Sequence, residues 1–390
     1  MTLSKSALVV VGSGPAGLSA ARAYRKAGGV GGVLLVTADL YLPYNRPPLS
    51  KDFLRGESGL NELPLEDEAF YVDHEIEVLL GQRVTELVPG ENRVVLGDGE
   101  TVAFDRCVLA TGSAPNPLPV DGGDHPDLLM LRSRVDGERL RAAAEGAGSA
   151  VVIGFGFIGC EAAASLAGRG LSVTVVSTEE LPQAGRLGTE VGGRIAGWLD
   201  DAGVRLIGGV DVTSLPGGHR VQLADDTEYA ADLVLVAAGV TPQIDLAESA
   251  GLHTQQGRVV VDEQLRTSAD NVFAAGDIAH ARNVAAGRRL SVEHWGDAER
   301  MGEIAGTCAA GGDDRWAQAP GFWSEIGEHT LKYAAWGDGY DELRFVPHEH
   351  GGFTAWYGQN GTTVGVLTHR ADDDYQHGQR LVEDGAAWTG

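Results

Sequence analysis

Two segments of the chain repeat the same pattern of hydrophobic and polar positions. Each starts with an unbroken apolar run, passes through three glycines spaced G-x-G-x-x-G, and leads through a helix-forming stretch to a second apolar run. The predicted strand, helix and strand are 7–11, 18–26 and 33–36 in the first copy, and 150–153, 160–166 and 173–176 in the second. Because these strands lack alternating polar residues, they suit a parallel sheet that is covered on both faces. The pattern therefore predicts two βαβ units.

The glycines of the two motifs have distinct roles in such a unit. The first glycine allows a tight turn, the second lets the backbone approach a pyrophosphate, and the third lets the helix pack closely against the strand. The phosphates then lie at the helix N-terminus, which favours an anion. The glycines are Gly12, Gly14 and Gly17 in the first motif and Gly154, Gly156 and Gly159 in the second. Two copies, each between a strand and a helix, predict two bound dinucleotides.

Further apolar runs predict strands outside the two repeats, at 93–96, 106–110, 204–207, 233–237 and 271–275. Beyond residue 321 the pattern changes to short β segments between glycine-rich turns, a pattern typical of hairpins. These segments are 331–336, 342–346, 353–357 and 363–367, and a helix is predicted at 373–383. The predicted fold class is α/β, with two Rossmann-like dinucleotide-binding domains and a small C-terminal α+β domain.

Composition narrows the class of protein. The 390 residues carry a net charge of −25, which disfavours nucleic acid or an anionic membrane as a partner. No apolar run approaches the roughly 18 residues of a membrane-spanning helix. Cys107, Cys160 and Cys308 are too few and too far apart for a disulfide scaffold or a zinc site, so no metal site is predicted. These features predict a cytoplasmic protein.

The ends of predicted strands carry candidate cofactor contacts. Small residues follow two strands around Thr111 and Gly239, where the backbone could lie against a bound molecule. Asp277 follows another strand and a glycine, and its carboxylate can accept hydrogen bonds from a ribitol hydroxyl. The first 51 residues hold six lysines and arginines against the single acid Asp39, and this local positive charge suits a pyrophosphate.

Three motifs resemble a known family. The segment 42–51 reads Leu-Pro-Tyr-Asn-Arg-Pro-Pro-Leu-Ser-Lys, residues 292–295 read Val-Glu-His-Trp, and residues 322–324 read Phe-Trp-Ser. Together they are similar to the ferredoxin and rubredoxin reductases of oxygenase systems, within the FAD-dependent pyridine nucleotide–disulfide oxidoreductases. The resemblance covers roughly residues 6–327. It implies an FAD-binding domain at 1–115 and 240–317, an NAD(H)-binding domain at 116–239 and a C-terminal domain at 318–390.

The resemblance also assigns residues to the two cofactors. The implied FAD contacts are Gly12, Gly14, Gly17, Asp39, Arg46, Lys51, Val84, Thr111, Asp277, Trp295 and Trp323. The implied NAD contacts are Gly154, Gly156, Gly159, Glu161 and Gly239. Asp39 is the only candidate for the acid that binds the FAD ribose, one position later than expected.

Lys51 and Glu161 are the candidate catalytic residues. In the arrangement that the resemblance implies, the ammonium and the carboxylate meet beside the flavin, where the nicotinamide stacks. A cation there would stabilise electron density that arrives at flavin N5. A competing interpretation is that Glu161 only interacts favourably with a helix dipole, although the first motif has Ser19 at this position. Residues 40–60 contain no cysteine, which disfavours a dithiol or cysteine-sulfenate cycle.

The choice of nicotinamide cofactor depends on the end of the strand at 173–176. A carboxylate there usually binds the NAD ribose, whereas a basic residue admits the 2′-phosphate of NADP. Ser177 stands at the expected carboxylate position, Glu179 and Glu180 follow it, and the first basic residue is Arg186. The segment therefore predicts NADH as the preferred cofactor and NADPH as a poorer one.

With the family resemblance, these features predict an NADH-dependent ferredoxin reductase, in which hydride passes from NADH to FAD. Single electrons would then pass to a small acidic [2Fe-2S]-type or similar ferredoxin that serves an oxygenase or cytochrome P450. Two alternatives stay open: a flavin-dependent NAD(P)H oxidoreductase that reduces O₂ or a quinone directly, and an FAD- and NADH-binding redox-sensing interaction protein. The segment 281–292 holds Arg282, Arg288 and Arg289 without an acid, and is the candidate docking surface. A monomer or a homodimer is expected.

Overall fold

The first predicted βαβ unit forms the centre of a seven-stranded sheet. The computed structural model describes residues 3–390. In it β1 (Leu3–Val11), α1 (Pro15–Lys26) and β2 (Val33–Val36) make the unit, and β1 pairs in parallel with β2 on one side and β6 (Thr101–Leu109) on the other. The strand order is β3-β2-β1-β6-β5-β4, and β18 (Val272–Ala274) also pairs with β6. The other strands are β3 (Ile76–Leu79), β4 (Val84–Val88) and β5 (Arg93–Leu96).

The second βαβ unit forms a separate four-stranded parallel sheet. Here β8 (Ser149–Ile153), α5 (Phe157–Gly168) and β9 (Ser172–Val176) follow the predicted order, and the sheet runs β10-β9-β8-β14. Its outer strands are β10 (Arg205–Ile207) and β14 (Leu233–Val236). The helices of this part are α4 (Arg134–Ala144), α6 (Ala184–Leu187) and α7 (Thr189–Asp201). A small antiparallel sheet follows, made of β11 (Val212–Ser214), β12 (Arg220–Leu223) and β13 (Glu228–Ala230).

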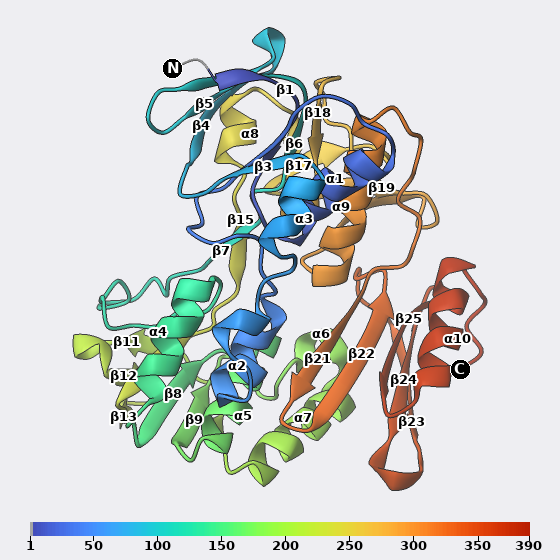
Figure 1. Ribbon diagram of the computed structural model, residues 1–390. Coiled ribbons are helices and arrows are strands. Elements are labelled where there is room, and N and C mark those ends of the chain that lie inside the picture. Colours follow the sequence, from blue (N-terminus) through green and yellow to red (C-terminus); the bar gives the residue numbers. More distant parts are fainter. Residues whose placement is uncertain (1–2) are drawn as a thin grey trace.

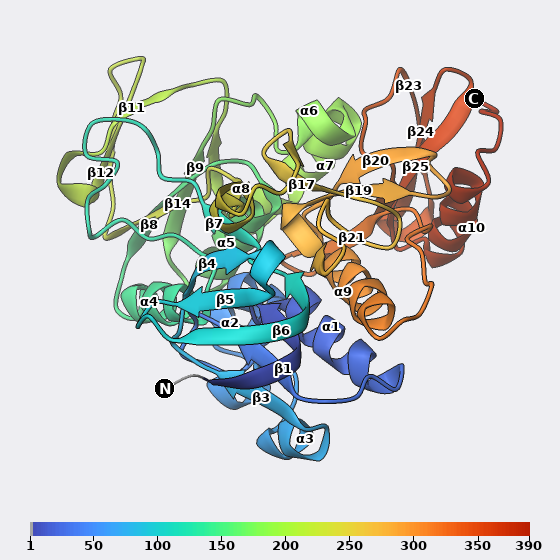
Figure 2. The same cartoon turned by 90° about the horizontal axis from the view of Figure 1, so that it is seen from above.

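Two short strands carry the chain between these sheets. β7 (Ser113–Pro115) leaves the first sheet and β15 (Val240–Pro242) returns to it, and the two pair antiparallel. The returning chain adds a sheet of β16 (Thr254–Gln255), β17 (Arg258–Val261), β19 (Ala279–Asn283) and β20 (Arg288–Ser291). It also adds α9 (Trp295–Ala309), which packs beside α1 (Figure 2). The three predicted domain ranges stay a prediction, although the seven-stranded and the four-stranded sheet each contain their own βαβ unit.

The C-terminal part is a five-stranded antiparallel sheet covered by a helix (Figure 1). The order β21-β22-β25-β24-β23 comprises β21 (Gly321–Ile326), β22 (His329–Ala335), β23 (Glu342–Pro347), β24 (Phe353–Gln359) and β25 (Thr362–His369), and α10 (Asp372–Glu383) follows. The apolar pattern did not predict β21, because only two of its six residues are buried. Buried residues of this sheet, such as Ile326 and Leu331, share one hydrophobic core with α5 and α7. The C-terminal sheet is therefore packed against the second βαβ unit.

Three further short helices complete the fold. They are α2 (Asp52–Arg55), α3 (Glu68–Asp73) and α8 (Asp245–Ser249). A 3₁₀ turn at Pro47–Ser50 precedes α2. None of the helices within residues 3–390 is both long and apolar enough to cross a bilayer.

Candidate functional site

A cavity of about 2020 Å³ is lined by residues of both βαβ units and of the C-terminal sheet. Ordinary ligand pockets measure about 300–1,000 Å³. The cavity therefore has room for more than one large ligand, which agrees with the two dinucleotides predicted from the glycine motifs.

The first glycine motif shapes one side of this cavity. At Gly12 the backbone has φ +109°, and a Cβ there would lie 2.1 Å from the Ala110 carbonyl oxygen, so only glycine fits. Helix α1 begins after Gly14 without a side-chain cap, which leaves its first N–H groups free for an anion. The Arg46 guanidinium lies 3.4 Å from the place of a Cβ on Gly14, and no carboxylate among the described residues pairs with it. These features fit a pyrophosphate.

The second motif repeats this arrangement around α5. Gly154 has φ +115°, and α5 begins after Gly156, again without a side-chain cap. Gly12, Gly14 and Gly156 line the cavity, whereas Gly17, Gly154 and Gly159 do not. A Cβ on Gly17 or Gly159 would lie 1.9 or 2.3 Å from the carbonyl oxygen of the first glycine of its own motif. The third glycines therefore allow helix and strand to pack, and do not reach the cavity themselves.

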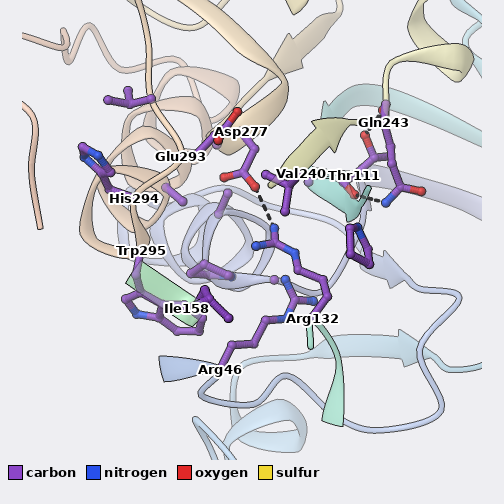
Figure 3. Close-up of a pocket in the computed structure, with 18 of the residues that line it drawn as sticks. Arg46, Thr111, Arg132, Ile158, Val240, Gln243, Asp277, Glu293, His294 and Trp295 are labelled. Atoms are coloured by element: carbon purple, nitrogen blue, oxygen red, sulfur yellow. Dashed lines mark hydrogen bonds and ion pairs between the residues drawn. The ribbon is translucent and has the colours of Figure 1, made fainter. Parts of the chain in front are cut away.

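Asp277 and Thr111 lie on the cavity wall, as Figure 3 shows, and both have protein partners. Arg132 Nη2 donates to Asp277 Oδ2 at 2.6 Å, and Arg132 Nε donates to the Ser113 carbonyl at 3.1 Å. The Thr111 hydroxyl donates to the Gln243 carbonyl at 2.7 Å. No sequence pattern indicated Arg132, because it belongs to no motif and stands 145 residues from Asp277.

The remaining predicted FAD contacts also line the cavity: Asp39, Val84, Trp295 and Trp323. Asp39 is already held, because the Tyr44 hydroxyl donates to its Oδ2 at 2.8 Å. Burial raises the pKa of Tyr44, so this hydroxyl keeps its proton. Trp295 Nε1 donates to Glu299 Oε1 at 3.0 Å, and Trp323 is 42% exposed at the cavity edge.

Lys51 and Glu161 form a buried ion pair in the wall of the cavity. Lys51 Nζ donates to Glu161 Oε2 at 2.7 Å, and their side chains are only 8% and 3% exposed. Lys51 also donates to the Pro47 carbonyl at 3.1 Å. An ammonium has three N–H groups, so one stays available to a ligand in the cavity. The structure thus brings together the two predicted catalytic residues, which stand 110 positions apart.

Three further donors converge on Glu161, and the sequence did not predict them. Ser50 Oγ donates to Oε2 at 2.6 Å, while Ser324 Oγ and the backbone N–H of Glu325 donate to Oε1 at 2.7 and 3.3 Å. Ser50 and Ser324 do stand inside family-like motifs, which is the one signal that could have identified them.

On the side of the second motif, Glu179, Arg186 and Gly239 line the cavity, whereas Ser177 does not. The Ser177 hydroxyl instead accepts a hydrogen bond from the Glu179 N–H at 3.2 Å. Arg186 lies over the rings of Phe322 and Tyr333, 5.2 and 5.6 Å from their centroids. Glu179 and Arg186 are therefore both charged residues after β9 that face the cavity, and the Arg186 guanidinium lies against the rings of the C-terminal sheet.

The three cysteines are buried and free. Burial raises the pKa of Cys107 and Cys160 far above the ordinary thiol range and that of Cys308 to about 11, so none is a thiolate at neutral pH. Within residues 3–390 no group of three or more His, Cys, Asp or Glu side chains could hold a metal ion.

The predicted docking segment is less basic than its sequence indicates. Arg288 forms an ion pair with Asp338, which comes from the loop after β22, and Arg282 lies 3.9 Å from the Glu263 carboxylate. Both acids lie outside 281–292, so the composition of the segment could not show them. Arg289 is exposed and forms no ion pair with another described residue.

Comparisons with known proteins agree with this geometry. The family model described as pyridine nucleotide-disulphide oxidoreductase matches residues 6–302. The chain is 34% identical to a rubredoxin-NAD(+) reductase of Pseudomonas putida, over 86% of this chain and 88% of that protein. It is 33% identical to the ferredoxin reductase component of a chlorobenzene dioxygenase from Cupriavidus sp. (strain PS12), over 97% and 93%.

Solved structures show the same likeness over nearly the whole chain. The ferredoxin reductase for the CYP199A2 system from Rhodopseudomonas palustris superimposes with a TM-score of 0.93 at 30% identity, over 98% of this chain and 96% of that chain. The reductase in a covalent putidaredoxin reductase–putidaredoxin complex gives a TM-score of 0.93 at 29% identity, over 98% and 94%. The chain therefore belongs to the pyridine nucleotide-disulphide oxidoreductase family, in its ferredoxin reductase subfamily.

Proposed function

We propose that this oxidoreductase is an NADH-dependent ferredoxin reductase that uses FAD and delivers single electrons to a small acidic iron–sulfur protein of an oxygenase or cytochrome P450 system. The observation that carries the proposal is one cavity that joins two uncapped helix N-termini to the buried Lys51–Glu161 pair. The relatives named above are reductases of this kind, and a flavin and NAD(H) follow from the family.

We assign the two helix N-termini to the two cofactors. The FAD contacts would be Gly12, Gly14, Asp39, Arg46, Lys51, Val84, Thr111, Arg132, Asp277, Trp295 and Trp323. Gly156, Glu161, Glu179 and Gly239 would face the nicotinamide nucleotide. When bound, FAD supplies a centre that accepts hydride and releases electrons one at a time.

The chain's own residues have three tasks in this function. The N-terminus of α1 and Arg46 bind the pyrophosphate, and α5 does the same for the second dinucleotide. Lys51 holds a positive charge at the cavity, where it favours electron density arriving from NADH. The cysteines hold no thiolate, so electrons leave without a dithiol relay. Docking of an acidic acceptor, the monomer or homodimer state and a cytoplasmic location stay predictions.

An anaerobic NADH titration of the purified protein, followed by an acceptor screen, tests the proposal. We expect non-covalent FAD, bleaching of its absorbance by one equivalent of NADH, and fast cytochrome c reduction only when a ferredoxin is added. Fast turnover with O₂ or a quinone alone would favour the direct reductase instead. A stable reduced complex that no acceptor reoxidises would favour the redox-sensing protein. Protein that binds no added FAD would refute all three.

A further inference from the structure

The carboxylate of Glu161 is the point where the three main parts of the fold meet. Glu161 belongs to α5, Ser50 and Lys51 to the turn before α2, and Ser324 to β21. All four side chains are buried, with Ser50 and Ser324 each 1% exposed. The hydrogen bond from Ser324 to Glu161 therefore links the C-terminal sheet to the cavity wall.

Every partner of this carboxylate is a donor. Oε2 accepts from the Ser50 hydroxyl and the Lys51 ammonium, and Oε1 accepts from the Ser324 hydroxyl and the Glu325 N–H. An ionised carboxylate accepts at both oxygens, whereas a carboxylic acid would turn an O–H toward these donors. The four donors therefore occupy both oxygens of the carboxylate and fix its plane.

We propose that Ser324, assisted by Ser50, is a positioning residue for hydride transfer: its hydroxyl holds Glu161, and Glu161 holds the Lys51 ammonium at the cavity. The role rests on the proposed function. Lys51 keeps one N–H for the flavin only while its other two stay on Glu161 and the Pro47 carbonyl. Without the Ser324 hydroxyl, Oε1 retains one donor at 3.3 Å. With Oε1 held only by this weak bond, the plane of the carboxylate is no longer fixed, and the ammonium bonded to Oε2 shifts with it.

The same helix offers a matched control. Ser165 lies one turn after Glu161, is 2% exposed, and donates its hydroxyl to the Ser50 carbonyl at 2.7 Å. Ser165→Ala and Ser324→Ala each remove one buried hydroxyl, but only the Ser324 hydroxyl donates to the Glu161 carboxylate. A difference between the two variants therefore reports on Glu161 rather than on packing.

The kinetic test is stopped-flow reduction of the FAD-loaded protein by NADH. We expect Ser324→Ala to lower the limiting rate constant about tenfold or more, the scale of a lost hydrogen bond to a charged group, with FAD content and the apparent Kd for NADH unchanged. Ser324→Thr keeps the hydroxyl and should restore most of the rate, and Ser165→Ala should match the wild type. Ser50→Ala removes one of the two donors to Oε2 and should also slow reduction. This variant tests the role without any change in β21.

A second readout uses the flavin-free protein. Ser324→Ala should lower the melting temperature of the wild type but not that of Glu161→Met, which has no acceptor for the hydroxyl. The role is overturned if Ser324→Ala is reduced at the wild-type rate, if Ser165→Ala slows reduction equally, or if the two melting effects simply add. Wild-type protein that NADH does not reduce would instead refute the proposed function, and the melting cycle would still show whether Ser324 acts through Glu161.

Discussion

The partners of the Lys51–Glu161 pair predict that a change of Glu161 lowers the stability more than a change of Lys51. Removing one partner of a buried ion pair costs about 3–5 kcal/mol, because the other charge stays buried without its counter-ion. Glu161→Gln removes the counter-charge of the Lys51 ammonium and places an amide NH₂ donor where one carboxylate oxygen accepted hydrogen bonds. Lys51→Met leaves the Glu161 carboxylate with three donors, from Ser50, Ser324 and Glu325. We therefore expect Glu161→Gln near the upper end of this range, Lys51→Met near the lower end, and the double variant well below their sum.

Urea unfolding of the flavin-free variants, followed by circular dichroism and tryptophan fluorescence, measures these differences. Lys332→Met is the control, because Lys332 pairs with Asp372 at a similar distance of 2.8 Å but with side chains 40% and 65% exposed. An exposed pair of this kind contributes about 0–1 kcal/mol. The reasoning would be refuted if both buried variants lost no more than this control, or if Lys51→Met were the more damaging of the two.

Three further predictions follow from other parts of the structure. Glu179 follows β9 and lines the cavity, so Glu179→Lys should raise kcat/KM for NADPH relative to that for NADH about tenfold, equivalent to about 1.4 kcal/mol. An unchanged ratio would show that the 2′-phosphate lies elsewhere. Burial lowers the pKa of His329 and His369, which lie beside Trp198 between α7 and the C-terminal sheet, below the ordinary 6.5. The contribution of the two neutral histidines to stability is then complete above pH 6.5 and is lost as the pH falls through and below this value. The melting temperature should therefore drop between pH 7 and 5, and it should drop less in the double His→Gln variant. Curves of melting temperature against pH that run parallel for the two proteins would contradict this assignment. Arg289→Glu should slow ferredoxin reduction at low salt but leave ferricyanide reduction unchanged, and equal effects on both acceptors would place docking elsewhere.

Local patterns predicted the two βαβ units, four strands and the helix of the C-terminal part, and the core of the site. The two glycine motifs located both βαβ units, because a tight turn, a close backbone approach and close helix packing each require glycine at a set spacing. The strands of the C-terminal sheet followed from β segments between glycine-rich turns, with the exception of β21. That strand is half-exposed, so its hydrophobic pattern was too weak to predict it.

The sequence by itself determined the chemistry that is encoded within a few residues: two helix N-termini for anions, and a segment at 40–60 without a cysteine. The pairing of Lys51 with Glu161, 110 positions apart, was implied only by the family resemblance. Only the tertiary structure decided how distant side chains meet, because such contacts depend on the packing of separate units and not on any local period. Arg132 reaches Asp277 across 145 positions, and Ser324 reaches Glu161 across 163. Packing also supplied Asp338 to Arg288, which neutralises part of a segment that looks purely basic in sequence. The sequence shows which residues are charged, but the tertiary structure decides which of them form ion pairs.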